Sequence, residues 1–294
     1  MRDDDIRRQA IELYDRFTHE GMDRRLFIGR MVALAGSLAA AEALIGAIAA
    51  SPAAAAVIPE DDRRIKTSND TLLGMSKFPK HAVYVAAPAG GPPRRPSVLV
   101  IHENRGLNDH IRDVTRRLAV AGFYAVAPDF LSPSGGTPAD PDAARDAIGK
   151  LDLGATTAAA VAMIGELKAR VDGRPQVGAA GFCWGGAFVN RLAVAAGGQL
   201  DAGVVYYGPG PDPSEAPRVQ APLMIHHAGR DARVAQTLWP WIAALRAAGK
   251  PVTYFNYEGA DHAFNNDTSA ERYSKPAADL AWKRTLRFFR KHLA

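Results

Sequence analysis

The sequence predicts an α/β protein, with a mostly parallel central sheet flanked by helices on both faces and a helical or signal-like extension before it. Over residues 57–294, short apolar runs alternate with helical stretches, which is the order of parallel strand–helix units. Most of these runs are continuously apolar, as strands buried on both faces should be. Composition changes near residue 56. We therefore expect an N-terminal extension, 1–56, and one domain, 57–294.

Each expected strand is a short apolar or β-branched run bounded by turn signals or a helical stretch. The seven strands predicted in this way are 82–87, 97–102, 124–128, 176–181, 203–207, 223–227 and 252–257. Stretches with helical periodicity separate them. The five predicted helices are 109–121, 153–170, 186–196, 234–248 and 277–292. The Pro-rich segments 88–96 and 132–141 are expected to be surface loops.

Composition excludes several classes of protein. Of the 294 residues 47% are hydrophobic and 23% charged, so the chain is neither wholly disordered nor a polytopic membrane protein. The single cysteine, Cys183, excludes an intramolecular disulfide and a cage of cysteines around zinc. The net charge of +5 is diffuse, because no run of Lys or Arg exceeds two residues, so no nucleic-acid partner is expected. No oligomeric state is indicated.

The extension begins with a polar stretch. Apolar side chains at Ile6, Ala10, Leu13 and Phe17 recur at helical spacing, so residues 1–22 are expected to include a short amphipathic helix.

The rest of the extension allows two interpretations. Residues 24–28 pair two arginines with Leu-Phe-Ile, which resembles a twin-arginine export signal. The uncharged residues 31–41 suit the apolar part of such a signal but are too few to span a bilayer, and 54–56 offer a small-residue cleavage site. The protein would then be exported to the periplasm, with no stable membrane span. Alternatively, Glu42 and the long polar lead favour a retained helix on a cytoplasmic protein.

A pattern typical of a catalytic nucleophile follows the strand predicted at 176–181. The sequence GFCWGG at 181–186 is the G-x-nucleophile-x-G pattern of a nucleophile elbow, with Cys183 as the nucleophile. Small neighbours let the strand and the next helix approach closely, and the helix N-terminus favours thiolate over thiol. The alternative is that Cys183 is an inert buried side chain. Its place between a strand and a helix favours the nucleophile.

An acid and a base follow in the order that α/β-hydrolases use, nucleophile then acid then histidine. Asp231 lies in a turn after the strand at 223–227, and His262 follows the strand at 252–257. Loops at the carboxyl ends of neighbouring strands can bring both side chains to the thiol, with His262 as base and Asp231 to orient it. Asp231 is also a common turn former. Asp261 is an alternative acid, but a sequence neighbour reaches the far ring nitrogen poorly.

The remaining candidate residues follow the second predicted strand. There the backbone N–H of Asn104 is expected to form an oxyanion hole with that of Trp184, each contributing roughly 3–4 kcal/mol. Glu103 faces the same crevice and would hydrogen-bond the thiol or touch the substrate; alternatively, it orients its own loop. His226 and His227 are expected to serve in packing or to support the catalytic groups.

Five motifs are spread along the domain. They are IHENRGLN at 101–108, APD at 127–129, GFCWGG at 181–186, YYG at 206–208 and DHAF at 261–264. Together they resemble the dienelactone hydrolase (carboxymethylenebutenolidase) family of the α/β-hydrolase superfamily, over about residues 65–294. The stretch 265–282 is similar to a bacterial branch of this family that carries an N-terminal extension.

The resemblance implies hydrolysis of a small-molecule ester or lactone through an acyl-cysteine intermediate. It implies a triad of Cys183, His262 and Asp231, with Glu103 as the glutamate that pairs with the thiol before substrate arrives. It also implies that no metal and no cofactor take part.

The sequence departs from the family pattern where substrate is recognised. Family members carry an Arg after the Pro-Asp segment and another four residues after the catalytic histidine, and both bind the substrate carboxylate. Here 130–133 read FLSP, and Asn266 holds the second position. Because a carboxylate without a bidentate cation is poorly paired in a dry pocket, we expect a neutral ester or lactone. Arg105 and Arg272 are candidate substitutes, and something other than a substrate carboxylate must release the thiol from Glu103.

Other functions could use the same residues. A thioesterase or an acyl-peptide hydrolase would employ the same triad, whereas a non-enzymatic binding protein would keep only the fold. A thiol redox sensor would need an external thiol, because the chain has no second cysteine. The presence of all three triad residues favours the hydrolase.

Overall fold

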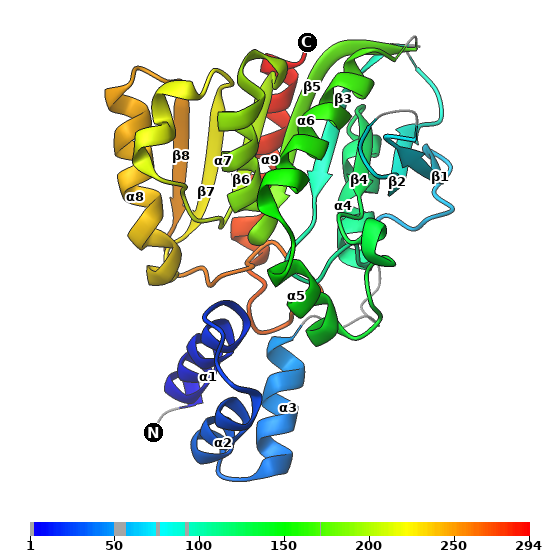
Figure 1. Cartoon of the computed structure of the whole chain (residues 1–294). Helices are drawn as coiled ribbons and strands as arrows, with labels where there is room; N and C mark the ends of the chain where they lie inside the picture. Colours follow the sequence, from blue (N-terminus) through cyan, green and yellow to red (C-terminus); the bar gives the residue numbers. More distant parts are fainter. Residues whose placement is uncertain (1–2, 50–56, 75–76, 92–93, 171) are drawn as a thin grey trace.

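The structure, a computed structural model, describes residues 3–49, 57–74, 77–91, 94–170 and 172–294. Its centre is an eight-stranded sheet of order β1-β2-β4-β3-β5-β6-β7-β8 (Figure 1). β2 pairs antiparallel with β1 and β4, and the other neighbours are parallel. The strands are β1 Ile65–Leu72, β2 His81–Pro88, β3 Arg95–Ile101, β4 Tyr124–Pro128, β5 Gly173–Phe182, β6 Ala202–Tyr206, β7 Leu223–Ala228 and β8 Val252–Tyr257. The predicted fold class is confirmed.

Helices cover both faces of the sheet, as parallel strands require (Figure 1). α6, α7 and α8 pack on one face, and α4 and α9 pack on the other. The helices of the domain are α4 Asp109–Val120, α5 Pro141–Gly149, α6 Leu153–Lys168, α7 Trp184–Ala196, α8 Ala232–Ala247 and α9 Lys275–His292, with 3₁₀ turns at Ser132–Ser134, Gly197–Gln199 and Pro213–Arg218.

Alternate residues of the central strands fill two separate cores. In β3, Leu99 and Ile101 belong to the core with α6, α7 and α8, whereas Val98 and Val100 belong to the core with α4 and α9. All four side chains are fully buried. Successive side chains of a strand point to opposite faces, so a continuously apolar strand supplies both cores at once. The central strands are thereby fixed in the middle of the domain.

The seven predicted strands and five predicted helices of the domain are present, with ends that differ by a few residues. Two further elements are not predicted by the sequence. β1 is a largely exposed edge strand whose polar residues carry no hydrophobic alternation. α5 begins at Pro141, at the end of the segment predicted as a loop. Asp140 caps it by accepting the N–H of Asp142, and proline fits a first helical turn.

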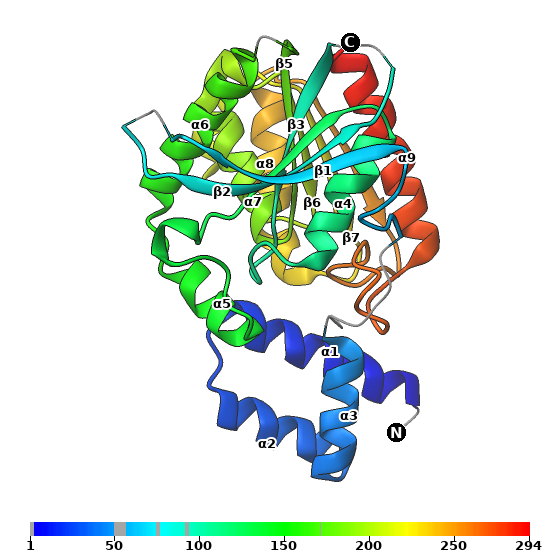
Figure 2. The ribbon, with the colours of Figure 1, turned by 90° about the vertical axis from the view of Figure 1, so that its right-hand side faces the viewer.

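Residues 3–48 form three helices, α1 Asp3–His19, α2 Arg24–Ala35 and α3 Leu38–Ile48, which we call the N-terminal helical unit. The unit lies beyond the carboxyl ends of the parallel strands (Figures 1 and 2). It has a small core of its own, where Phe17 stacks on Phe27 with 4.2 Å between ring centroids. The amphipathic helix expected within residues 1–22 corresponds to α1.

The segment that resembles an export signal is helical. The Asp23 carboxylate begins α2 by accepting the N–H groups of Arg25 and Leu26, at 2.9 and 3.1 Å. α2 and α3 meet at a bend of 106°. Among the described residues no single helix has both the length and the apolar character to cross a membrane, although the bent pairs α2–α3 and α5–α6 pass on length and composition. The predicted cleavage site at 54–56 lies outside the described residues.

Polar contacts join the N-terminal helical unit to the domain, among them contacts at the end of α3 and at the start of α2. At the end of α3, the carbonyl oxygen of Ile48 accepts from Ser269 Oγ at 2.5 Å and from Arg272 Nε at 3.1 Å. At the start of α2, Arg24 pairs with Asp142 of α5 at 3.1 Å. These contacts hold the unit over the end of the sheet where the candidate catalytic residues gather.

Candidate active site

Cys183 occupies a strained turn between β5 and α7. Its φ of 54° and ψ of −113° lie outside the regions that L-residues favour. The turn is tight, because a Cβ added to Gly181 would lie 2.0 Å from the carbonyl oxygen of Gly185. A Cβ added to Gly185 would lie 2.4 Å from the carbonyl oxygen of Ile101. Backbone contact therefore requires these glycines, and α7 begins immediately after the thiol.

His262 and Asp231 meet beside this turn. His262, in the loop after β8, contacts Asp231 Oδ2 through Nδ1 at 2.5 Å. The other carboxylate oxygen accepts the N–H of Val234 at 3.0 Å, so Asp231 is also the cap that begins α8. A ring nitrogen of His262 lies within 4.8 Å of Cys183 Sγ. The structure thus brings together the three side chains predicted as a triad.

Asp231 and His262 each stabilise the charged form of the other. Burial lowers the pKa of His262, but the Cys183 thiolate and the Asp231 carboxylate outweigh it and raise the pKa to about 10. Burial raises the pKa of Asp231, but the positive charges of His262 and Arg233 outweigh it and hold the pKa well below its ordinary value. The charged imidazolium is therefore favoured below about pH 10 and is lost as the pH rises through that value.

The alternative acid and the other histidines of this region have different partners. The Asp261 carboxylate pairs with Arg230 at 3.4 Å. His226 is fully buried, and its Nδ1 contacts the Tyr257 hydroxyl at 2.9 Å. His227, which follows on the same strand, is also buried. These positions agree with packing roles for the two histidines.

Glu103 lies in the same cavity and is bonded to other side chains. Asn266 Nδ2 donates to one carboxylate oxygen at 2.9 Å, and the Tyr207 hydroxyl donates to the other at 3.4 Å. Glu103 is only 6% exposed, so these two bonds hold a buried carboxylate. Asn266, four residues after His262, therefore binds Glu103. The pairing of Glu103 with the thiol stays a prediction.

The two predicted oxyanion donors border the thiol. Trp184 is the first residue of α7, so its N–H is one of the groups that have no acceptor within the helix. Its ring stacks on His102, with 5.4 Å between centroids. Asn104 lines the same cavity as Cys183, and its side chain donates to the carbonyl oxygen of Thr18 at 3.3 Å. Their action on an oxyanion stays a prediction.

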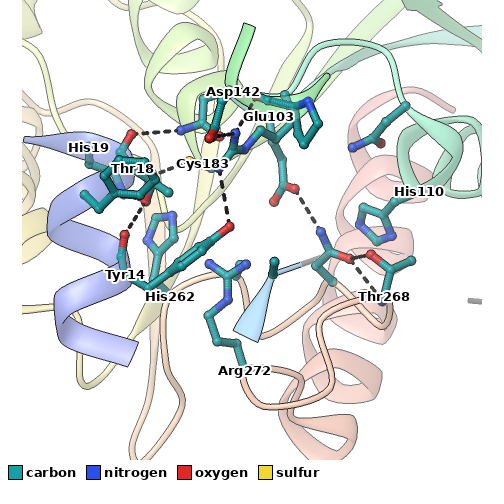
Figure 3. Close-up of a pocket in the computed structure, with 18 of the residues that line it drawn as sticks. Tyr14, Thr18, His19, Glu103, His110, Asp142, Cys183, His262, Thr268 and Arg272 are labelled. Atoms are coloured by element: carbon teal, nitrogen blue, oxygen red, sulfur yellow. Dashed lines mark hydrogen bonds and ion pairs between the residues drawn. The ribbon is translucent and has the colours of Figure 1, made fainter. Parts of the chain in front are cut away.

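A residue of the N-terminal helical unit completes the surroundings of the thiol (Figure 3). Nε2 of His19, the last residue of α1, lies 3.1 Å from Cys183 Sγ. The His19 ring meets the ring of His262 edge-on, with 4.7 Å between centroids. Burial, followed by the charge of His262, lowers the pKa of His19 well below its ordinary value. His19 is therefore a neutral imidazole against the thiol.

These side chains line a cavity of about 520 Å³ between the domain and the N-terminal helical unit (Figure 3). The unit contributes an aromatic and aliphatic part of the wall, including Tyr14, Phe17, Phe27 and Ile28. The domain contributes the thiol and its polar neighbours. An apolar wall with a few convergent polar groups is the usual composition of a small-molecule site.

Both arginines considered as substitutes lie in this wall and already have partners. Arg105 donates to Asp142 Oδ1 at 2.8 Å and to the Tyr14 hydroxyl at 3.3 Å. Arg272 pairs with Asp15 Oδ1 at 3.5 Å. Burial raises the pKa of Asp15, and the positive charges of His262 and Arg272 oppose that rise. The positive charges near the thiol are thus met by carboxylates of the protein itself.

Sequence analysis did not identify Tyr14, Asp15 and His19 as site residues. Their spacing in the sequence was the available signal. Tyr14 and Thr18 lie four residues apart, as do Asp15 and His19, so the members of each pair are neighbours on one helix. That pattern shows which residues share a helix face. It does not show which surface of the domain the face covers.

Comparisons with known proteins agree with the geometry. A model of the family described as "Dienelactone hydrolase family" matches residues 81–293. A Methylorubrum extorquens protein named "Putative carboxymethylenebutenolidase" is 31% identical over 290 residues, covering 90% of this chain and 94% of its own. An Escherichia coli protein of the same name is 29% identical over 266 residues, covering 83% and 94%. A Klebsiella pneumoniae crystal structure named "Putative Dienelactone Hydrolase" aligns at a TM-score of 0.69 and 28% identity, covering 77% of this chain and 99% of that chain.

Replacing Asp231→Asn is expected to slow alkylation of Cys183 by iodoacetamide at neutral pH. Without the carboxylate, the pKa of His262 falls, because burial is then opposed by the thiolate alone, and less imidazolium–thiolate pair is present. A fall of one pKa unit corresponds to about a tenfold change in the equilibrium constant between the imidazolium–thiolate pair and the neutral pair. The measurement is the alkylation rate between about pH 5 and pH 10.

Asp261→Asn is the matched control, because it removes the neighbouring carboxylate that pairs with Arg230. If Asp261→Asn slowed alkylation and Asp231→Asn did not, the orienting acid would be Asp261.

Proposed function

From the premise that this chain belongs to the dienelactone hydrolase family and is a hydrolase of esters or lactones, we propose that it cleaves a neutral carboxylic ester or lactone through an acyl-cysteine. The observation that carries this proposal is the 2.5 Å contact of Asp231 with His262, beside a cysteine on a strained turn. It supports a triad in which Cys183 is the nucleophile, His262 the base and Asp231 the orienting acid.

The reaction begins when the Cys183 thiolate, paired with the His262 imidazolium, attacks the carbonyl carbon of the substrate. The carbonyl oxygen becomes an oxyanion, which the backbone N–H groups of Trp184 and Asn104 stabilise. The bond between this carbon and the alkoxy oxygen of the ester or lactone then breaks, and His262 gives its proton to the leaving alkoxide. Next, His262 takes a proton from water, and the resulting hydroxide attacks the acyl-cysteine. The acid leaves and the thiolate is restored.

A neutral substrate is favoured by the charges of the cavity wall. Arg105 is already paired with Asp142, and Arg272 with Asp15. A substrate carboxylate would have to displace a buried carboxylate of the protein to gain a cation, and each unpaired buried charge carries a penalty of several kcal/mol. A neutral ester or lactone fits against the aromatic wall of the N-terminal helical unit without that exchange.

The contacts of the N-terminal helical unit support its retention on the working enzyme. Tyr14 and Phe17 are part of the cavity wall, His19 touches the nucleophile, and the carbonyl of Ile48 is bonded to the loop before α9. Removal of residues 1–56 would open this wall to solvent. Of the two fates predicted for the extension, retention therefore agrees better with the cavity, and export on a twin-arginine signal stays the alternative.

We expect Cys183→Ala to abolish hydrolysis while the fold, followed by circular dichroism, is unchanged. Loss of a nucleophile lowers kcat by at least about 10³-fold. Cys183→Ser should keep only a small part of the hydrolytic activity, because His262 is suited to a thiol and not to a hydroxyl in this site. The measurement is a panel of p-nitrophenyl esters, neutral lactones and cis-dienelactone. Full activity of Cys183→Ala would overturn the triad, and dienelactone as the best substrate would overturn the preference for neutral substrates.

We expect Asp15→Asn to shift specificity towards anionic substrates. The change removes the carboxylate beside Nη1 of Arg272 and leaves that end of the guanidinium to bind a substrate carboxylate. KM for p-nitrophenyl hemisuccinate should fall by about tenfold, which is 1.4 kcal/mol. KM for neutral p-nitrophenyl acetate should stay within about twofold. Glu12→Gln, an exposed change of equal charge on α1, is the control. Equal effects of both variants would assign the shift to net charge.

Retention of the helical unit predicts the mass of the mature polypeptide. Protein isolated from its own cells and measured intact by mass spectrometry should contain residues 3–48. A polypeptide that begins at Val57 would contradict retention and support cleavage of an export signal.

A further inference from the structure

Three electron-pair donors from distant parts of the chain converge at the nucleophile. They are Nε2 of His19 at the end of α1, Sγ of Cys183 on the elbow and a ring nitrogen of His262 after β8. Sγ lies 3.1 Å from the His19 nitrogen, and all three atoms lie within 4.8 Å of one another. In Figure 3, His19, Cys183 and His262 lie at the same end of the cavity.

Both imidazoles are held so that Nε2 faces the thiol. Nδ1 of His19 lies 2.9 Å from the carbonyl oxygen of Asp15, which can only accept, so the Nδ1 proton is placed there. Nδ1 of His262 is bonded to the carboxylate of Asp231 at 2.5 Å. An imidazole whose Nδ1–H is bonded to a carbonyl or carboxylate is the usual form of a histidine that ligates a metal through Nε2.

The three electron-pair donors share too few protons for each of their lone pairs to accept a hydrogen bond. If the Cys183 thiol keeps its proton, it can donate to one imidazole, and the other Nε2 has no donor. If the proton moves to His262, the lone pair of His19 faces a thiolate. In either state one lone pair of the cluster stays unsatisfied, and His262 Nε2 is among the described side-chain atoms that are buried without a hydrogen-bond partner. A buried unsatisfied acceptor costs about 1–3 kcal/mol.

We propose that this cluster is an inhibitory zinc site, in which Nε2 of His19, Sγ of Cys183 and Nε2 of His262 bind one Zn²⁺. Thiolate and imidazole are the ligands that Zn²⁺ prefers, and a three-residue set leaves a fourth position for water on the cavity side. At Zn–S of about 2.3 Å and Zn–N of about 2.0–2.1 Å, tetrahedral ligand atoms lie about 3.3–3.6 Å apart. In the structure, the His19 nitrogen and the sulfur lie 3.1 Å apart, and all three atoms lie within 4.8 Å of one another. Such a site uses one cysteine, so it is compatible with a chain that has a single cysteine.

Charges around the cluster suit a cation. The Asp231 carboxylate is bonded to the His262 imidazole, the Asp15 carboxylate lies beside Arg272, and Glu103 lines the same cavity. Arg233 and Arg272 face the cluster with positive charge, and each is paired with one of these carboxylates, at 3.7 and 3.5 Å. The Zn–thiolate bond occupies the sulfur electron pair that would attack the substrate.

The predicted inhibition rests on the proposed function, whereas the binding of metal does not. Zinc also ties α1 to the elbow through His19, so it fixes the N-terminal helical unit to the domain. The site is therefore a property of the full chain. Without the extension, two protein ligands remain, and affinity falls sharply.

The test uses the full chain freed of metal with a chelator. Zn²⁺ affinity is measured by competition with a chromophoric chelator, and Co²⁺ is added separately to record the thiolate-to-cobalt charge-transfer band. We expect one Zn²⁺ per chain, a cobalt band that disappears in Cys183→Ala, and reversible inhibition of ester hydrolysis by Zn²⁺. In His19→Gln the affinity should fall by at least about 10–100-fold. Glutamine can still accept a hydrogen bond from the thiol but is a poor zinc ligand.

His110→Gln is the matched control, since His110 lines the same cavity but is bonded to Asp267. It should keep the affinity for Zn²⁺. Equal affinity of His19→Gln and the unchanged chain would overturn the proposal, as would the absence of stoichiometric binding or of a cobalt–thiolate band. Failure of the triad is a separate result, seen as hydrolysis by Cys183→Ala in metal-free buffer.

Discussion

The close crossing of β5, α7 and the end of β3 is the constraint on which the site depends. Gly181 and Gly185 allow the backbones to approach to distances that a Cβ would block. Between them Cys183 is held at φ 54°, a conformation that costs about 1–3 kcal/mol and persists because its N–H is bonded to the Tyr206 carbonyl at 3.0 Å. The two cores on either side of the sheet supply the rigidity. The thiol is thereby fixed at the N-terminus of α7, where His262 and Asp231 reach it.

Much of this arrangement could be predicted from the sequence because its causes are local. A strand buried on both faces has to be apolar throughout, so the central strands are visible as continuous runs, and the helices between them by their period. The elbow requires glycines at fixed spacing around Cys183, and strand ends place Asp231 and His262 at one edge of the sheet. β1 could not be predicted in this way, because an exposed edge strand needs few apolar residues.

The unpredicted parts of the site depend on contacts between residues far apart in the sequence. The pairing of Asp15 with Arg272, and of Asn266 with Glu103, joins segments whose relative position only the folded chain defines. The helical spacing in α1 shows that Asp15 and His19 share a face. It carries no information on the surface that this face covers, because the apolar residues of α1 are already used in the core of the N-terminal helical unit.

The same contacts link specificity and regulation. The protein supplies a partner for each of the polar groups around the thiol. Asp142 and Asp15 meet the two arginines, Asn266 meets Glu103, and His19 meets the thiol. A neutral substrate leaves these pairs intact. Because His19 is the partner closest to the sulfur and is neutral, it leaves a lone pair free at the nucleophile. A cation with affinity for sulfur and nitrogen can use that lone pair, and a carboxylate cannot.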